Sequence, residues 1–143
     1  MPDNPVSTLD PAYETAIRAL FGNVAFARLL DISLESLSPG RATMTMPMRP
    51  ELGQLLGYTH GGAVAGLVDT VASFCWRTLL PIEAQAVAIE LKHNFLRPLT
   101  DGVIRAEAEM VHSGKKTGVI LVRVFNEADK LAGLATVTYM RIG

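Results

Sequence analysis

The segment from Gly61 to Leu79 most constrains how this chain can fold, because it has the pattern of one long helix with two unlike faces. At ~100° per residue, its bulky apolar side chains fall within about a third of the circumference: Val64, Leu67, Val68, Val71, Phe74 and Cys75. The opposite side carries small residues around one carboxylate: Gly62, Ala65, Gly66, Asp69 and Ser73. We expect the first face to be buried within the chain, and the second to let another backbone approach closely.

Strand patterns on both sides of this segment predict what buries the bulky face. Apolar and polar residues alternate on either side of the turn Ser38-Pro39-Gly40, which predicts a hairpin from residues 30–35 and 41–48. Four more strands are predicted over 87–95, 103–111, 119–125 and 131–142. Their separators are too short for crossover helices, so neighbouring strands should pair antiparallel. One helix facing about six strands is best buried if the sheet curls around it, which is an α+β fold.

The first 29 residues form a helical segment ahead of this core. Apolar residues recur at three-to-four spacing from Tyr13 to Leu29, and Asp10 followed by Pro11 is typical of a helix start. The 143 residues are the usual size of one domain, divided here into this segment (1–29) and a core (30–143). Hydrophobic residues make up 49% and charged residues 19%. This balance excludes a disordered chain and predicts that some surface is hidden against a second copy.

Charge and cysteine content exclude several classes of function. A net charge of −1 gives no basis for binding a polyanion, so we expect no nucleic-acid partner. One cysteine and three scattered histidines are too few for a structural zinc cluster. The start Met1–Pro5 lacks the pattern of a signal peptide, and the charge-free stretch 52–68 is too short and too polar to span a bilayer. We therefore expect no metal, no membrane partner and a cytoplasmic location.

The sequence His60-Gly61-Gly62 stands immediately before the two-faced helix. Backbone N–H groups in a first helical turn have no partner within the helix, and the helix dipole adds positive charge there. Such donors suit an anion or a developing oxyanion. The alternative is a glycine-rich start of a tightly packed helix with His60 as an ordinary cap, and the motif alone leaves both interpretations open.

Asp69, in the middle of the helix, is a stronger candidate for a functional residue than the glycine motif. A buried carboxylate is costly without a partner, and none of the residues three or four positions away is cationic. A freely exposed Asp69 is the alternative, but its neighbours are glycine, alanine and serine rather than lysine and glutamate. The nine residues from His60 to Asp69 rise about 13.5 Å and turn about 900°. If both serve one site, two chains must contribute, helix beside helix and antiparallel.

Four short motifs carry a resemblance to a known family: Gly57-Tyr58-Thr59-His60-Gly61-Gly62, Asp69-Thr70, Asn94-Phe95-Leu96-Arg97-Pro98 and Ser113-Gly114-Lys115. From Leu30 to the C-terminus the chain resembles the hotdog-fold acyl-CoA thioesterases. It is most similar to the PaaI-type branch of the 4-hydroxybenzoyl-CoA thioesterase superfamily. The resemblance implies a hotdog fold, a sheet wrapped around a central helix, with paired sheets in a homodimer and often a dimer of dimers.

The resemblance also implies roles for individual residues. The Gly61 N–H would polarise the carbonyl of an acyl-CoA thioester, and His60 would orient the glycine loop. Asp69 of the partner chain would act as general base on water, or as the nucleophile itself. No metal or redox cofactor is implied, because coenzyme A is part of the substrate.

Two positions depart from the family pattern. Gln54 stands where an asparagine is frequent, and Ala88 stands where a serine or threonine often positions water. Gln54 remains a candidate catalytic amide, whereas Ala88 cannot hydrogen-bond through its side chain. These departures keep open a second hypothesis, a non-catalytic module that senses acyl-CoA. A hotdog dehydratase is a weaker third, and the acyl group is not specified by the sequence.

Five further residues are candidates for binding the substrate: Gly62, Ser73, Arg97, Lys115 and Lys116. The two lysines could meet the phosphates of coenzyme A or be solvated turn residues, and Ser73 could bond Asp69, line the pocket or simply pack. Other polar and aromatic residues are predicted to do less: His93 in the core or an interface, His112 exposed, Cys75 buried and inert, Phe74 in the core, and Trp76 in either the core or the acyl pocket.

Overall fold

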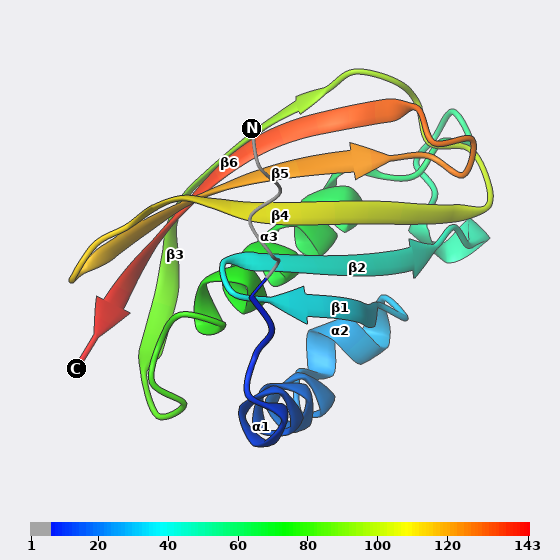
Figure 1. The fold of residues 1–143 in the computed structure, drawn as a ribbon. Helices are drawn as coiled ribbons and strands as arrows, with labels where there is room; N and C mark the ends of the chain where they lie inside the picture. Colours follow the sequence, from blue (N-terminus) through cyan, green and yellow to red (C-terminus); the bar gives the residue numbers. More distant parts are fainter. Residues whose placement is uncertain (1–6) are drawn as a thin grey trace.

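The computed structural model describes residues 7–143, in which a six-stranded antiparallel sheet curls around the helix α3 (Gly61–Arg77) (Figure 1). In chain order the strands are β1 (Ser33–Ser38), β2 (Arg41–Pro47), β3 (Gln85–Phe95), β4 (Val103–Ser113), β5 (Thr117–Phe125) and β6 (Leu131–Ile142). A single 3₁₀ turn, η1 (Pro50–Leu52), precedes α3. The predicted hotdog architecture is confirmed. No helix in the described part of the chain is long and apolar enough to cross a membrane.

The N-terminal segment contains two helices rather than the single predicted one. α1 (Pro11–Gly22) begins at Asp10, whose carboxylate accepts from the Tyr13 N–H at 3.0 Å. The helix ends because Asn23 caps it and Val24 turns to an extended conformation, and α2 (Ala25–Leu29) follows. Residues 1–6 of the predicted segment lie outside the described residues.

The strand order corrects the prediction that β3 and β4 pair as chain neighbours. The order in the sheet is β1-β2-β4-β5-β6-β3, so β3 lies at an edge and pairs antiparallel with β6. The segment between β3 and β4 runs past the end of the curled sheet, where the Leu99 carbonyl accepts from the Thr59 N–H at 2.7 Å. A bulge at Ile89 also reverses the alternation, so that Val87 and Leu91 lie on opposite faces of β3.

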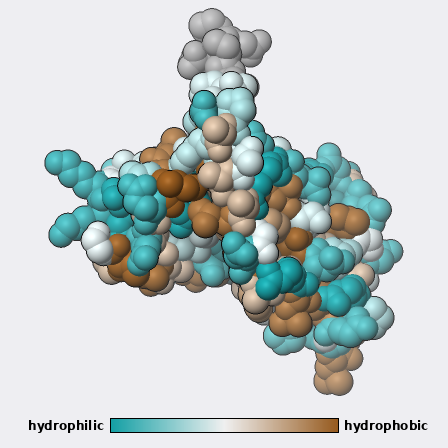
Figure 2. Space-filling view, turned by 90° about the horizontal axis from the view of Figure 1, so that it is seen from below, coloured by the Kyte–Doolittle hydropathy of each residue, from teal (hydrophilic) through white to brown (hydrophobic). Residues whose placement is uncertain are grey.

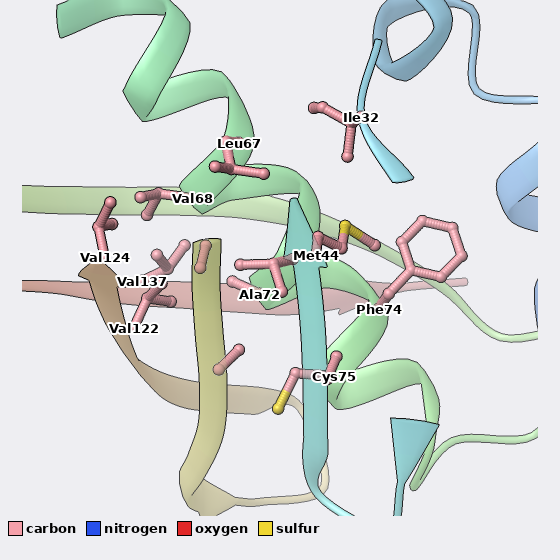
Figure 3. Close-up of a cluster of buried hydrophobic side chains, with 14 of the residues drawn as sticks. Ile32, Met44, Leu67, Val68, Ala72, Phe74, Cys75, Val122, Val124 and Val137 are labelled. Atoms are coloured by element: carbon pink, nitrogen blue, oxygen red, sulfur yellow. The ribbon is translucent and has the colours of Figure 1, made fainter. Parts of the chain in front are cut away.

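The bulky face of α3 packs into the concave side of the sheet as predicted. Side chains of β2, β5 and β6 surround it, among them Met44, Val122 and Val137 (Figure 3). Phe74 instead meets α1, where its ring packs edge-to-face on Phe21 at a centroid distance of 5.4 Å. Trp76 is 1% exposed and donates from Nε1 to Ser113 Oγ at 3.0 Å, so it belongs to the core rather than to an acyl pocket.

Gly118 of β5 leaves the space that the Trp76 ring fills. A Cβ at Gly118 would lie 2.7 Å from a ring atom, which requires the ring or the strand to move. We expect Gly118→Ala to lower the free energy of unfolding by about 1–3 kcal/mol, measured by urea denaturation at one fixed protein concentration. Gly22→Ala is the control, because nothing lies within 4 Å of a Cβ at Gly22. Equal unfolding midpoints for both variants would contradict this packing argument.

Candidate active site

The first turn of α3 leaves one backbone donor free. His60 caps the helix, and its Nδ1 accepts from the Gly62 N–H at 2.8 Å. The N–H groups of Ala63 and Val64 donate to the His60 carbonyl at 3.0 and 3.3 Å. The N–H of Gly61 has no acceptor among residues 7–143. His60 therefore does act as a cap, and the cap leaves the Gly61 N–H as a donor at the positive end of the helix dipole.

Gly61 opens onto a cavity of about 330 Å³ beside the end of β3. Gln54 and Arg97 supply polar groups to its wall, and the apolar part of the wall includes Phe95 and Leu99. The side-chain carbonyl of Gln54 accepts from the Leu56 N–H, so its amide N–H groups are the part left to donate. The structure thus brings the predicted residues Gln54, Gly61 and Arg97 together around one cavity.

Asp69 has a partner within the chain that the sequence analysis missed. The hydroxyl of Tyr139 donates to Asp69 Oδ1 at 2.6 Å and approaches the Asp69 carbonyl at 2.9 Å. Tyr139 lies on the inner face of β6 and is 5% exposed. Burial raises the pKa of the Tyr139 phenol, and the nearby Asp69 carboxylate raises it further. A buried tyrosine needs an acceptor for its hydroxyl, which is the only signal that the sequence offered.

The small-residue face of α3 is partly covered by the chain itself. At Gly66 a Cβ would lie 2.7 Å from the Phe26 ring and 3.0 Å from Leu30, so these two side chains of α2 and its C-cap pack directly against the backbone of α3. Asp69 and Ser73 remain half-buried. The Ser73 hydroxyl faces Tyr139 and lowers the pKa of its phenol, but the opposite effect of burial is larger. Ser73 also lines a second cavity, of about 390 Å³, between α1 and α3.

The remaining candidate residues lie at opposite ends of the sheet. Arg97 follows β3 and lines the Gly61 cavity, whereas Lys115 and Lys116 are exposed in the turn between β4 and β5. β4 has eleven residues and therefore separates the two ends by about 35 Å. One chain cannot bring Arg97 and these lysines to the same group of phosphates. Asp69 lies toward the end of the sheet that carries the lysines, because its partner Tyr139 pairs with Gly118 beside their turn, whereas the Gly61 cavity lies toward the other end, beside Phe95 and Arg97.

The other histidines and the cysteine are placed as follows. His93 is on the inner face of β3 and stacks on Phe95 at a centroid distance of 4.1 Å. Burial lowers its pKa, which favours the neutral ring, and neither ring nitrogen finds a partner within the described residues. His112 is exposed, as predicted. Cys75 is fully buried, as predicted, and burial raises the pKa of its thiol to about 12.

Comparison with known proteins decides the family. The sequence model of the thioesterase superfamily matches residues 56–132, more than half of the chain. This chain belongs to the thioesterase superfamily. The thioesterase is 32% identical over 127 residues to acyl-coenzyme A thioesterase PaaI of Escherichia coli (strain K12), covering 87% of this chain and 88% of that protein. It is 27% identical over 109 residues to the 1,4-dihydroxy-2-naphthoyl-CoA hydrolase of Listeria monocytogenes serotype 1/2a (strain 10403S), covering 76% of this chain and 89% of that protein.

The solved structures agree with the sequence relatives. The structure of the E. coli PaaI protein matches this thioesterase with a TM-score of 0.87 at 29% identity, covering 95% of this chain and 97% of that one. The resemblance drawn from the four motifs is therefore confirmed: the chain is a PaaI-type hotdog thioesterase, a thioester hydrolase.

The buried thiol gives a test of which groups the thioesterase uses. With a pKa of about 12, roughly one Cys75 thiol in 10⁴ would be ionised at pH 8. We expect the native protein to take up no label from excess iodoacetamide and to keep its hydrolytic activity. In urea the single cysteine should take up label, which is read by mass spectrometry. Labelling of the native protein with loss of activity would contradict an inert Cys75.

Proposed function

We propose that this thioesterase hydrolyses acyl-CoA at a site that two copies of the chain build together. The observation that carries the proposal is the free Gly61 N–H, which lines a cavity at the start of α3 while Asp69 lies about two turns further along the same helix. The names of the E. coli and Listeria relatives, which act on coenzyme A thioesters, support this substrate class.

The proposed reaction needs one base and one oxyanion donor. Asp69 Oδ2 takes a proton from water as the water oxygen attacks the thioester carbon, and the Gly61 N–H binds the carbonyl oxygen as it becomes negative. The carbonyl then re-forms, the carbon–sulfur bond breaks, and the thiolate takes the proton held by Asp69. The products are a carboxylic acid and coenzyme A. Both catalytic groups belong to the chain, so the proposed reaction uses no further cofactor.

The exposed edge and inner face of β3 support a homodimer. β3 pairs on one side only, and its apolar side chains include Ile89 at 54% and Phe95 at 59% exposure. An unpaired edge with apolar side chains is a template for pairing with another strand. Apolar patches interrupt the polar surface of the side seen in Figure 2, which views the molecule from below. An antiparallel two-fold arrangement would cover the edge and the remaining small-residue face of α3.

The same arrangement would complete the site. It carries Asp69, Lys115 and Lys116 of one protomer toward the Gly61 cavity and Arg97 of the partner. Cations from both protomers would then be available for the phosphates of coenzyme A. A dimer of dimers is compatible with this arrangement, but the proposed site needs only the dimer.

A thiol-release assay across acyl-CoAs with aromatic, medium-chain and hydroxylated acyl groups tests the activity directly. We expect release of coenzyme A above the uncatalysed rate for at least one class. Binding of the same compounds by calorimetry without turnover of any of them would contradict acyl-CoA as the substrate class.

Asp69→Asn tests the base. The amide keeps the shape and can still accept from Tyr139 but cannot take a proton, so we expect kcat to fall by about 10²–10⁴. Asp10→Asn is the matched control, because asparagine caps α1 as well as aspartate does and Asp10 is remote from the site. Both variants should match the parent protein in circular dichroism and in size-exclusion volume. Full activity of a folded, dimeric Asp69→Asn would refute the assignment.

Gly61→Pro tests the donor, because it removes the free N–H at a helix position where proline is favoured. The backbone of His60, at φ −61° and ψ 134°, suits a residue that precedes proline. We expect kcat to fall by about 10²–10³. Gly61→Ala is the control: it keeps the N–H, and its Cβ would meet the Phe95 ring at 3.1 Å, which an exposed side chain can accommodate.

Mixing the two inactive variants tests whether the site is shared. After co-refolding at equal concentration, half of the dimers are mixed, and each mixed dimer has one site with an intact Gly61 and an intact Asp69. We therefore expect activity to recover to about a quarter of the parent level. Absence of recovery, with mixed dimers demonstrated by tags of different mass, would place both groups in one chain.

A further inference from the structure

We propose that Tyr139 is a positioning residue for the hydrolysis: its hydroxyl holds the Asp69 carboxylate in the orientation that leaves one oxygen facing the site. The inference rests on the proposed function of Asp69 as the base. Its basis is the Tyr139–Asp69 hydrogen bond between β6 and α3.

Tyr139 lies on a strand that is paired on both sides, which defines the position of its ring relative to Asp69. β6 lies between β5 and β3, and Tyr139 is paired with Gly118 on one side and Ala88 on the other. The ring is buried against α3 and is 5% exposed. Close packing around the ring and strand pairing on both sides of β6 therefore restrict where the hydroxyl can lie.

The hydrogen bond from Tyr139 gives the Asp69 carboxylate a donor and also restricts its orientation. The Tyr139 oxygen lies 2.6 Å from Asp69 Oδ1 and 2.9 Å from the Asp69 carbonyl oxygen, so its single proton is shared between two acceptors of one residue and the carboxylate is the nearer. A distance of 2.6 Å is typical of a hydroxyl donating to an ionised carboxylate. Asp69 Oδ2 accepts from no group within residues 7–143 and is the oxygen left for water.

Tyr139 can donate under all conditions in which the enzyme would work. Burial, and then the adjacent carboxylate, raise the pKa of the phenol, so the hydroxyl keeps its proton. Without the hydroxyl, Asp69 would be a carboxylate on a half-buried helix face flanked by small residues and free to rotate. Misplacement of a reacting group by about 1 Å can cost 10²-fold in rate.

Tyr139→Phe removes the hydroxyl and keeps the ring. We expect kcat for the best acyl-CoA of the panel to fall by about 10- to 100-fold, with KM within about twofold of the parent value. In an Asp69→Asn background the same change should lower kcat no further, because Tyr139 acts through Asp69. Tyr13→Phe is the matched control: it also removes a phenol hydroxyl bonded to a residue of α3, the Arg77 carbonyl at 2.8 Å, but away from the site. Its kcat should equal that of the parent.

The outcomes separate this inference from the proposed function. Parent-like kcat in a folded Tyr139→Phe, with Asp69→Asn inactive, would overturn the positioning role and leave the base in place. An equal loss in the parent and Asp69→Asn backgrounds would also overturn it, because Tyr139 would then act independently. An active Asp69→Asn would overturn both. If Tyr139→Phe does not fold, Asp69→Glu replaces it: the base is kept but is one methylene longer, and full activity would overturn the need for a fixed carboxylate.

Discussion

Burial of one helix by one sheet is the constraint on which the rest of this structure depends. α3 is the only long helix in the described chain, and its bulky side chains need more apolar surface than a flat sheet offers. The sheet therefore curls around the helix. The packing is tight enough that the Trp76 ring occupies the space that a side chain at position 118 would need. Curling also carries β6 over the helix, so that Tyr139 reaches Asp69. The contact that orders the candidate base thus follows from how the core is packed.

The sequence predicts those parts of the fold that depend on local periodicity. α3 begins at the predicted residue, and five of the six strands lie where alternation predicts them, because a repeat of 3.6 or 2 is set by the residues themselves. The exception is β1, which runs over Ser33–Ser38 rather than the predicted 30–35 because Leu30 caps α2. The position of β3 beside β6 was not predictable in this way. It depends on the path of a loop across the end of a curved sheet, and the bulge at Ile89 depends on the same curvature. The break between α1 and α2 was not predicted either, because the apolar spacing continues through Asn23 and does not show that Asn23 caps α1.

The candidate site likewise contains residues that local sequence predicts and one residue that it does not. Asp69 stood out because its helical neighbours lack a counter-charge, and Gly61 because glycines precede a helix; both are signals within a few residues. Tyr139 is 70 positions from Asp69, and no spacing rule connects them. The residue pattern alone did not tell Gly61 from Gly62 as the free donor, and only the resemblance to the family singled out Gly61. That distinction rests on which N–H the His60 ring engages, a detail of side-chain geometry.

The distance between donor and base explains why the proposed site requires a second chain. Along one helix Gly61 and Asp69 are eight residues, about 12 Å, apart, so a single thioester group cannot touch both. In two antiparallel helices related by a two-fold axis, the same spacing places the start of each helix opposite the middle of the other. The same spacing would therefore set both sites of the dimer, and the part of the small-residue face that α2 leaves open, around Asp69 and Ser73, would face the partner helix. In the proposed dimer, catalysis would depend on association, because a single protomer holds the donor and the base too far apart to act on one thioester.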